Sequence, residues 1–511
     1  MNAPAAPALA GLHAPPAAES LDALVFANRF AALPADFFSR VPPTALPAPY
    51  WVGYSAAAGG LIGLDAQAGQ SDQLLATLAG NRVPAGADPL AAVYSGHQFG
   101  VYVPRLGDGR ALLLGEVTGP DGSPWEIQLK GAGLTPYSRS GDGRAVLRSS
   151  IREFLGSEAM AGLGIPTTRA LALVGSDTPV FRETTETAAV VTRLAPSFVR
   201  FGSFEYFAHT GQTERLRELV DYVVARYYPA VLGAPDPLLA WLGEVVARTA
   251  RLIARWQGVG FMHGVMNSDN MSILGLTLDY GPFQFMDGFD AAHICNHSDT
   301  QGRYAWHRQP EIGLWNLYAL GQALLPLGVD EAALRAVLDT YREHFGVALE
   351  DEFHAKLGLA TRHPDDEALI EDLLRLLHEQ RVDWPIFWRR LCRLPLVGDA
   401  AADASLRDLF SDRPAFDAWA LRYRARLAAE ASVDAERAAR MLATNPKYVL
   451  RNWIAEEVIR AARGDAGPRD FKPLADVLRM LERPYDEAPE FARYAALPPD
   501  WAAKLELSCS S

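Results

Sequence analysis

The chain has 511 residues, of which 49% are hydrophobic and 21% charged, and its net charge at pH 7 is -13. This composition is typical of a folded globular protein with roughly two to four domains or one large bilobal unit, and excludes a disordered chain. The acidic balance and the lack of a basic patch argue against nucleic-acid binding. No apolar run reaches the roughly 18 residues of a membrane span, so no membrane partner is expected.

Residues 1–20 are rich in Ala and Pro and have no basic region before an apolar stretch. This composition predicts a disordered tail rather than a signal or transit peptide. Three scattered cysteines, Cys295, Cys392 and Cys509, are too few for a disulfide scaffold or a zinc site and favour a reducing compartment, the cytoplasm.

Strand patterns follow the aromatic segment 24–41 and the Pro-rich stretch 42–49. Residues 101–106 and 111–117 are predicted to form a β-hairpin around Gly107, Asp108 and Gly109, because Asp-Gly supplies the positive φ of a tight turn. The next predicted strand, WEIQLK, ends at Lys130.

Residues 131–143 are rich in Gly and Ser and predict a loop before a helix over 144–163. Strands are predicted over 169–175 and 187–194, the second broken by Pro196. The remainder shows helical periodicity over 213–231, 237–257, 312–327 and several stretches from 331 to 483. It is interrupted between 258 and 290 by a polar loop and two short strands, 272–274 and 276–280, joined at Gly275.

This order predicts an α+β, protein-kinase-like bilobal fold. A small β-rich N-lobe with its lead-in spans 21–195, a large mainly helical C-lobe with extra helices spans 196–490, and a tail covers 491–511. In that fold a strand lysine contacts nucleotide phosphates and a glutamate on the next helix positions it. Lys130 and Glu153 fit these positions. Each is equally typical, by itself, of a strand-end lysine reaching water or a solvated helix glutamate.

The motif HGVMNSDN at 263–270, followed by LDYG at 278–281, resembles the HGDxxxxN and DFG motifs of kinase-like phosphotransferases. Asn270 and Asp279 fall on the metal positions, and hard oxygen ligands are what Mg²⁺ requires. A polar turn would explain either motif separately, but their order favours the kinase-like interpretation. Val265 occupies the place of the usual catalytic aspartate and cannot accept a proton, which leaves Asp269 as the candidate general base.

Longer strings carry a specific resemblance that runs from about residue 26 to the C-terminus. They are YSGHQFGVYVPRLGDGRALLLGE, WEIQLKGAGLTPYSRSGDGRAVLRSSIREFL, HGVMNSDNMSILGLTLDYGPF and NPKYVLRNW. With them the chain resembles the selenoprotein O (YdiU) family of protein adenylyltransferases. The resemblance implies a kinase-like fold that binds ATP in an inverted orientation. AMP is then transferred to Ser, Thr or Tyr hydroxyls of proteins and pyrophosphate is released, with UMP from UTP as an alternative.

The same resemblance assigns roles to individual positions. The nucleotide contacts would be Gly107, Gly109, Arg110, Lys130, Asp142, Gly143, Arg193, Arg200 and Asp279. Glu153 would position Lys130, Asp269 would be the base, and Asn270 and Asp279 would bind Mg²⁺, with Mn²⁺ as an alternative.

Cys509 lies two residues before the end, where some relatives carry selenocysteine, and Cys295 follows the DYG motif. A regulatory disulfide between Cys295 and Cys509 is one hypothesis, and two free thiols are the alternative. Cys392, in an apolar helix, is expected in the core.

Two other functions stay open at this point: a kinase-like phosphotransferase, and a nucleotide-binding pseudokinase scaffold suggested by Val265. The complete set of Lys130, Glu153, Asn270 and Asp279 argues against a scaffold. The expected protein is a cytoplasmic monomer whose partners are ATP and protein substrates, with no nucleic acid and no membrane.

Overall fold

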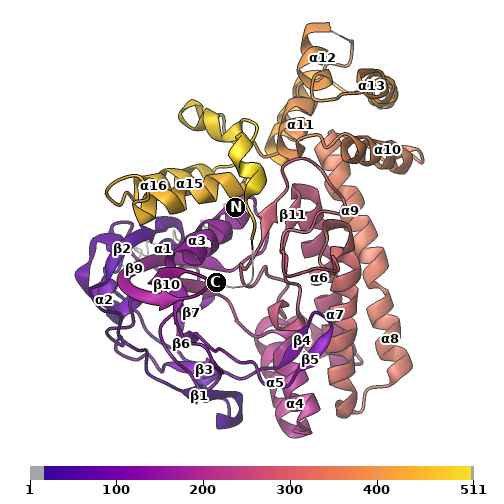
Figure 1. The fold of residues 1–511 in the computed structure, drawn as a ribbon. Coiled ribbons are helices and arrows are strands. Elements are labelled where there is room, and N and C mark those ends of the chain that lie inside the picture. Colours follow the sequence, from indigo (N-terminus) through magenta and orange to yellow (C-terminus); the bar gives the residue numbers. More distant parts are fainter. Residues whose placement is uncertain (1–16, 399, 508–511) are drawn as a thin grey trace, which may run out of the picture.

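The chain folds as an α+β protein in which residues up to 195 build the main β-sheet and later residues are mainly helical (Figure 1). The structure, a computed structural model, describes residues 17–398 and 400–507. The main sheet has the strand order β1-β3-β6-β7-β10-β9-β2, with β8 also paired to β10, and its strand pairs are antiparallel. Its strands are β1 (Phe38–Arg40), β2 (Tyr50–Tyr54), β3 (Leu90–Ala92), β6 (Ala111–Thr118), β7 (Pro124–Lys130), β8 (Ala145–Val146), β9 (Arg169–Phe181) and β10 (Thr185–Ala195).

Helix α3 (Leu147–Gly162) is buried on most of its surface. It packs against β9 and β10 on one side and against α15 (Asn452–Arg463) and α16 (Lys472–Leu481) on the other (Figure 1). Apolar residues such as Ile151 fill both contacts, but the helix also buries Glu153, which is 3% exposed. A carboxylate buried in this way needs cationic or hydrogen-bonding partners.

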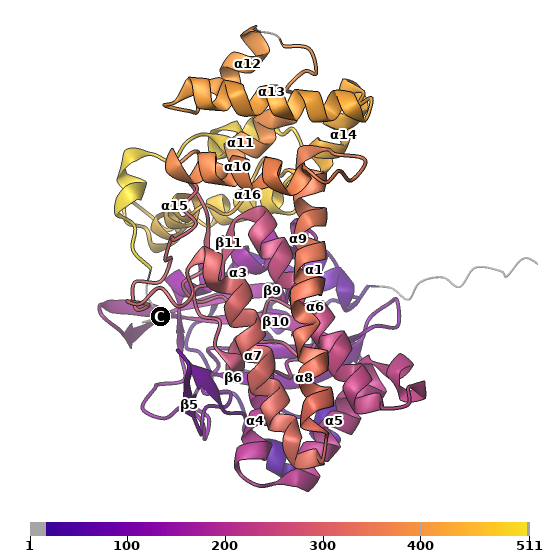
Figure 2. The ribbon, with the colours of Figure 1, turned by 90° about the vertical axis from the view of Figure 1, so that its right-hand side faces the viewer.

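The helical part forms two groups. Helix α6 packs against α7, α8 and α9, while α10 to α14 lie beyond the end of α9 (Figure 2). The helices are α4 (Phe201–His209), α5 (Thr213–Tyr227), α6 (Pro237–Val259), α7 (Gln309–Leu324), α8 (Glu331–Asp339), α9 (Tyr341–Leu357), α10 (Asp366–Glu379), α11 (Trp384–Leu391), α12 (Ala400–Arg407), α13 (Arg413–Ala429) and α14 (Asp434–Thr444). Cys392, directly after α11, is buried in the core of this second group.

Two small antiparallel sheets complete the strands. One pairs β4 (Gly96–Gln98) with β5 (Val101–Val103), and the other pairs β11 (Phe261–Met262) with β12 (Gln284–Phe285). The second pair brackets the polar segment that carries both kinase-like motifs. A 3-10 turn, η6 (Ser268–Asn270), lies within that segment.

The hairpin predicted for 101–117 is wrong. Segment 101–103 pairs with β4, whereas β6 pairs with β3 and β7. Asp108 is the cause: its backbone N–H donates to Ala92 O at 2.9 Å, and its carboxylate accepts from Ala92 N at 3.0 Å. The Gly-Asp-Gly stretch is therefore tied to the end of β3, and its positive φ falls on Gly107 (78°) instead of Gly109.

The two short strands predicted over 272–280 are also wrong. The segment forms only isolated bridges, such as Met271 with Thr277, although Gly275 has the positive φ (70°) of the predicted turn. The predicted helix over 144–163 starts at Leu147, because the preceding residues pair with β10 as β8. Helices α1 (Ala56–Leu61), α2 (Asp72–Leu78) and α4 were not predicted.

Both ends of the described chain make contacts. Ala18 forms a bridge with Leu64, so ordered structure begins inside the segment predicted as tail, whose residues 1–16 lie outside the description. In the C-terminal segment, η9 (Pro489–Ala495) and η10 (Asp500–Lys504) precede Leu507, whose carbonyl accepts a hydrogen bond of 3.0 Å from His297 N.

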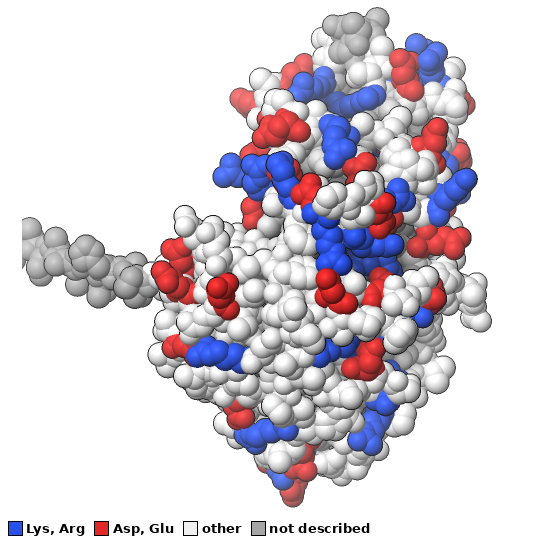
Figure 3. Space-filling view, turned by 60° about the vertical axis from the view of Figure 1, so that its left-hand side comes forward, with Lys and Arg blue, Asp and Glu red and all other residues white. Residues whose placement is uncertain are grey.

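None of the described helices has both the length and the apolar character needed to cross a membrane. On the face drawn in Figure 3, acidic and basic side chains are interspersed, with a gathering of Lys and Arg where the upper helical part meets the lower part.

Candidate functional site

A cavity of about 810 Å³ lies between the main sheet, the loop that follows β7 and the segment bracketed by β11 and β12. Most of the residues predicted as site residues line it. They are Gly107, Gly109, Arg110, Lys130, Asp142, Gly143, Glu153, Arg193, Asp269, Asn270 and Asp279. The fold thus brings together positions that are up to 172 residues apart, from Gly107 to Asp279.

Lys130 stands at the centre of a partly buried chain of ion pairs at the cavity. Its ammonium lies 2.6 Å from Glu153 Oε2 and 2.8 Å from Asp279 Oδ1. Strand β7 delivers the lysine and helix α3 the glutamate, and the packing of α3 against the sheet fixes the separation of their backbones. The two side chains are therefore paired with each other. The alternative interpretation of each position, a side chain in water, does not hold in the fold.

Two buried arginines surround Asp279 from the other side. Arg193 Nη1 contacts Asp279 Oδ1 and lies 3.2 Å from Glu153 Oε1, and Arg200 Nη1 lies 3.5 Å from Asp279 Oδ2. Each guanidinium also lies over an aromatic ring, Arg193 over Phe198 and Arg200 over Tyr94. Arg200 sits behind the cavity wall rather than in it and reaches the site through Asp279.

Asp279 carries the signs of a strained functional position. Its φ of 74° lies in the left-handed region, which costs free energy for a residue with a Cβ and recurs at active sites. Burial would raise the pKa of its carboxyl group, but Lys130, Arg193 and Arg200 outweigh burial and hold the pKa well below its ordinary value. Asp279 is therefore ionised and could bind a cation.

Asp269 has the opposite electrostatic environment. Burial raises the pKa of its carboxyl group to about 6, a value suited to a general base working near neutral pH. Within the described part of the chain, its Oδ1 atom is enclosed without a hydrogen-bond partner, and Oδ2 accepts from Gln98 Nε2 at 3.2 Å. Val265 lines the same cavity and contributes no ionisable group.

Asn270 and Asp279 fit the chemistry of a magnesium site. Asn270 uses its amide NH₂ to bond Val265 O at 2.9 Å, which leaves its amide oxygen out of that bond, and Asp279 supplies a carboxylate. Across residues 17–398 and 400–507, no group of three or more His, Cys, Asp or Glu side chains is placed to hold a metal. An ion bound here would depend on phosphate oxygens for further ligands, as Mg²⁺ commonly does.

The loop that follows β7 lines one wall of the cavity, and it packs closely against itself at a glycine. Gly143 has a φ of 72°, and a Cβ there would lie 2.2 Å from the backbone of Gly133, so a larger residue would push the loop apart. Asp142 is held by a two-pronged ion pair with Arg182, at 2.8 and 3.0 Å. Burial lowers the pKa of Arg110, which lines the same part of the cavity.

Cys295 lies outside this cavity. It is 5% exposed, and its thiol donates to Pro282 O at 3.0 Å. Cys295 and Leu507 line a smaller cavity of about 330 Å³. Cys509 lies outside the described residues, so its pairing with Cys295 stays a prediction.

A sequence profile of the family described as Protein adenylyltransferase SelO matches residues 20–482. The chain belongs to this family. The match includes every predicted site residue except Cys509.

Individual SelO relatives resemble the chain over nearly its whole length. Protein nucleotidyltransferase YdiU of Thiobacillus denitrificans is 58% identical over 494 residues, which cover 96% of this chain and 100% of the relative. The proteins of the same name from Cupriavidus metallidurans and Paraburkholderia xenovorans are 56% and 54% identical. They cover 94% and 99% of this chain and 90% and 99% of their own lengths.

Sequence reasoning missed several side chains of this SelO-family site. Gln98 bonds the candidate base, Gln128 accepts from Arg193 Nε at 3.0 Å, and Tyr94 supports Arg200. Gln98 and Tyr94 fall within the string that carries the family resemblance, which was the available signal. No sequence signal pointed to Gln128, because the position of a glutamine in an apolar strand does not indicate which side chain it will bond.

Proposed function

We propose that this chain transfers AMP from ATP to Ser, Thr or Tyr hydroxyls of proteins and releases pyrophosphate. The fold would be used as in a bilobal kinase, with the nucleotide between the sheet and the helical part, but inverted. One observation carries the proposal: three cations gather around Asp279, with Lys130 and Arg193 lining the cavity and Arg200 behind its wall.

The cluster favours phosphate over adenine as the group bound beside it. Guanidinium and ammonium groups form strong charge-assisted bonds with phosphate oxygens, and arginine presents a planar fork that matches them. An adenine ring would add no negative charge beside three cations that share only two carboxylates, those of Glu153 and Asp279. We assign the terminal phosphates to Lys130 and Arg193, which line the cavity, with the charge of Arg200 behind the wall adding to the attraction, and the α-phosphate then lies toward Asp269.

The transfer step then follows from the placement of the base. The acceptor hydroxyl oxygen forms a bond to the α-phosphorus, the bond from that phosphorus to the oxygen bridging to the β-phosphate breaks, and pyrophosphate leaves. The hydroxyl proton goes to the Asp269 carboxylate. A pKa of about 6 keeps this carboxylate largely ionised at neutral pH and able to accept the proton.

Residues of this chain would also stabilise the charge on the leaving group. Arg193 and Arg200 are held by buried partners before any ligand arrives, so they need little rearrangement to stabilise the departing pyrophosphate. Asn270 and Asp279 would hold Mg²⁺, or Mn²⁺ as an alternative, which neutralises phosphate charge when bound.

The test compares ATP labelled at the α-phosphate with ATP labelled at the γ-phosphate, each incubated with the purified protein, a protein acceptor and Mg²⁺ or Mn²⁺. Covalent label from α-labelled ATP alone is expected, with pyrophosphate as the second product. Label from γ-labelled ATP would establish a kinase instead. Absence of label from both, with ATP still bound, would establish a pseudokinase scaffold. UTP labelled at the α-phosphate, in a parallel reaction, measures the preference between AMP and UMP.

A further inference from the structure

The small β4–β5 sheet contacts residues 267–269, the segment that carries the candidate base, and the proposed chemistry has not used these contacts. His97 N donates to Ser268 Oγ at 2.7 Å, and Gln98 Nε2 donates to Asp269 Oδ2 at 3.2 Å. Phe99 N donates to Asn267 Oδ1 at 3.1 Å. Three successive residues of the hairpin thus bond three successive residues of the loop that carries the candidate base.

The β4–β5 hairpin is also anchored to helix α4. His97 Nδ1 lies 2.6 Å from Glu205 Oε2 on α4, and Glu205 is fully buried. Figure 1 shows β4 and β5 beside the helical part of the chain, where β4 packs against α4. A side chain carried by this hairpin is therefore held in a defined place relative to the cavity.

The two oxygens of Asp269 are in different surroundings. A Cβ on Gly96 would lie 2.9 Å from Asp269 Oδ1, so the hairpin backbone closes directly over that enclosed oxygen. Oδ2 instead bonds Gln98, which itself lines the cavity. An ionised carboxylate oxygen has two lone pairs, so Oδ2 can accept from Gln98 and from a second hydroxyl at once.

We propose that Gln98 is the positioning residue of Asp269, holding Oδ2 so that this oxygen receives the proton of the acceptor hydroxyl. The proposal rests on the proposed function, in which Asp269 is the base. Gln98 contributes no charge and moves no proton; its amide fixes the rotation of the carboxylate about its Cβ–Cγ bond. Gly96 contributes by leaving room for the aspartate under the hairpin.

The experiment measures kcat and KM for transfer from α-labelled ATP in Gln98→Met, Asp269→Asn and the double variant, each as the full chain. Gln98→Met keeps the length of the side chain and removes the donor. Its kcat is expected to fall about 10- to 100-fold, as for a misplaced catalytic group, with KM for ATP within about twofold of wild type. The double variant is expected to match Asp269→Asn within about twofold, because a base that is absent cannot be misplaced.

Gln73→Met is the matched control. Gln73 also bonds an aspartate, Asp22 Oδ2 at 2.7 Å, but on the exposed surface away from the cavity, and the variant is expected to keep wild-type kcat. Gln98→Glu, which keeps the shape and replaces the donor by a second carboxylate, is expected to lose at least as much kcat as Gln98→Met.

Wild-type kcat in Gln98→Met, or a fall in the double variant equal to the product of the two single effects, would overturn the proposal. Loss of folding in both Gln98 variants, measured by thermal unfolding, would also overturn it by assigning Gln98 to hairpin stability. The failure of the proposed function looks different: wild-type protein would then take no label from α-labelled ATP.

Discussion

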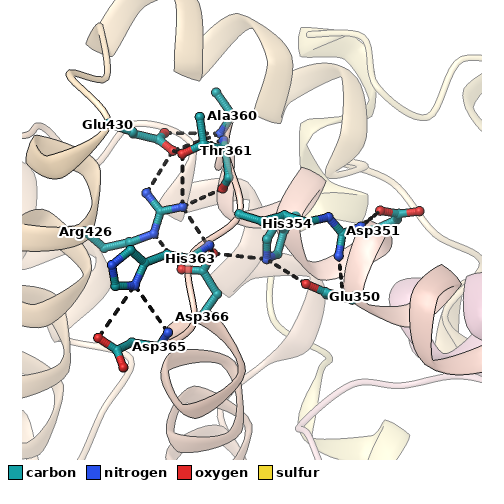
Figure 4. A network of polar contacts seen from close by, with 11 residues as sticks. Glu350, Asp351, His354, Ala360, Thr361, His363, Asp365, Asp366, Arg426 and Glu430 are labelled. Carbon is teal, nitrogen blue, oxygen red and sulfur yellow. Dashed lines mark hydrogen bonds and ion pairs between the residues drawn. The ribbon is translucent and has the colours of Figure 1, made fainter.

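Two networks of charged side chains in this molecule differ in how completely their members are paired. In the network between α9, α10 and α13, Arg426 lies between Asp366 and Glu430, with Nε 2.6 Å from Asp366 Oδ1 and Nη1 2.9 Å from Glu430 Oε2 (Figure 4). The backbone N–H groups of Ala360 and Thr361 also donate to Glu430. The cation and both carboxylates have partners from within the chain.

The cavity network is incomplete by the same standard. Lys130 and Arg193 share one oxygen of Asp279, and Arg200 reaches the other oxygen only at 3.5 Å. Among the residues that the structure describes, Asp269 Oδ1 has no hydrogen-bond partner. A fully paired network rigidifies the fold, whereas one with excess cations beside a cavity is prepared for an anionic ligand. This difference in pairing distinguishes the candidate site from the other network of charged residues, and it does so from the structure alone.

Breaking the cavity network is expected to have the largest effect. Asp279→Asn removes the charge that holds Lys130, Arg193 and Arg200 in place and that would bind the metal. Transfer of α-label should fall on the order of 10²- to 10³-fold or more, as when a preorganised electrostatic group is lost from an active site. The measurement is the initial rate of label incorporation at saturating ATP and metal. A rate within tenfold of wild type would remove Asp279 from the site.

Asp366→Asn makes the same chemical change in the other network and serves as the control. It weakens the ion pair of a buried arginine, Arg426, so it should cost about 2–3 kcal/mol of the free energy of unfolding. Transfer per folded molecule should stay at the wild-type rate. Denaturant unfolding and label incorporation on the same preparation separate the two effects, and a specific loss of transfer would contradict the distinction between the networks.

A buried lysine outside both networks, Lys356 on α9, predicts a pH dependence of stability. Its ammonium lies 4.5 Å from the ring centre of Trp388, and burial lowers its pKa to about 7. Between pH 7 and the ordinary lysine pKa of 10.5, the unfolded chain binds a proton that the folded chain releases, so the free energy of unfolding should rise with pH. Lys356→Met should raise stability at pH 7 by about 1–3 kcal/mol and flatten this rise. Unfolding midpoints at pH 7 and pH 9 in both proteins provide the measurement, and parallel curves would contradict the expected pKa.

The sequence predicted the long, strongly patterned elements and failed where tertiary contacts decide. Strand β7 and helix α6 follow from local pattern, since each is a continuous apolar or periodic run. The hairpin at 101–117 failed because Asp108 bonds Ala92 through both its backbone and its carboxylate, and a contact 16 residues away is invisible to a turn rule. Helix α4 was missed because it is short, Phe201–His209, although Phe201, Phe204 and Phe207 recur at helical spacing.

The sequence selected residues that the fold brings together. Lys130, Glu153, Asn270 and Asp279 were predicted because kinase-like chemistry constrains residue type and order, and all four line one cavity, while their roles stay predictions. Arg193 and Arg200 came only from the family resemblance, since an arginine at a strand end or a helix start has no distinguishing local pattern. Gln98 was missed because its meaning depends on a partner 171 residues away.

The smallest expected effect comes from restoring the residue that an ordinary kinase would have. Val265 lines the cavity, and Val265→Asp would supply a carboxylate in the usual catalytic position of the motif. If the terminal phosphates lie beside Lys130 and Arg193, the γ-phosphorus stays out of reach of that carboxylate. Transfer of γ-label should then remain at background, while transfer of α-label should fall by no more than about tenfold, because the new charge lies near the phosphates. Appearance of γ-label in this variant would mean that the triphosphate lies as in a kinase, so the comparison of the two labels in one substitution tests the orientation of the nucleotide directly.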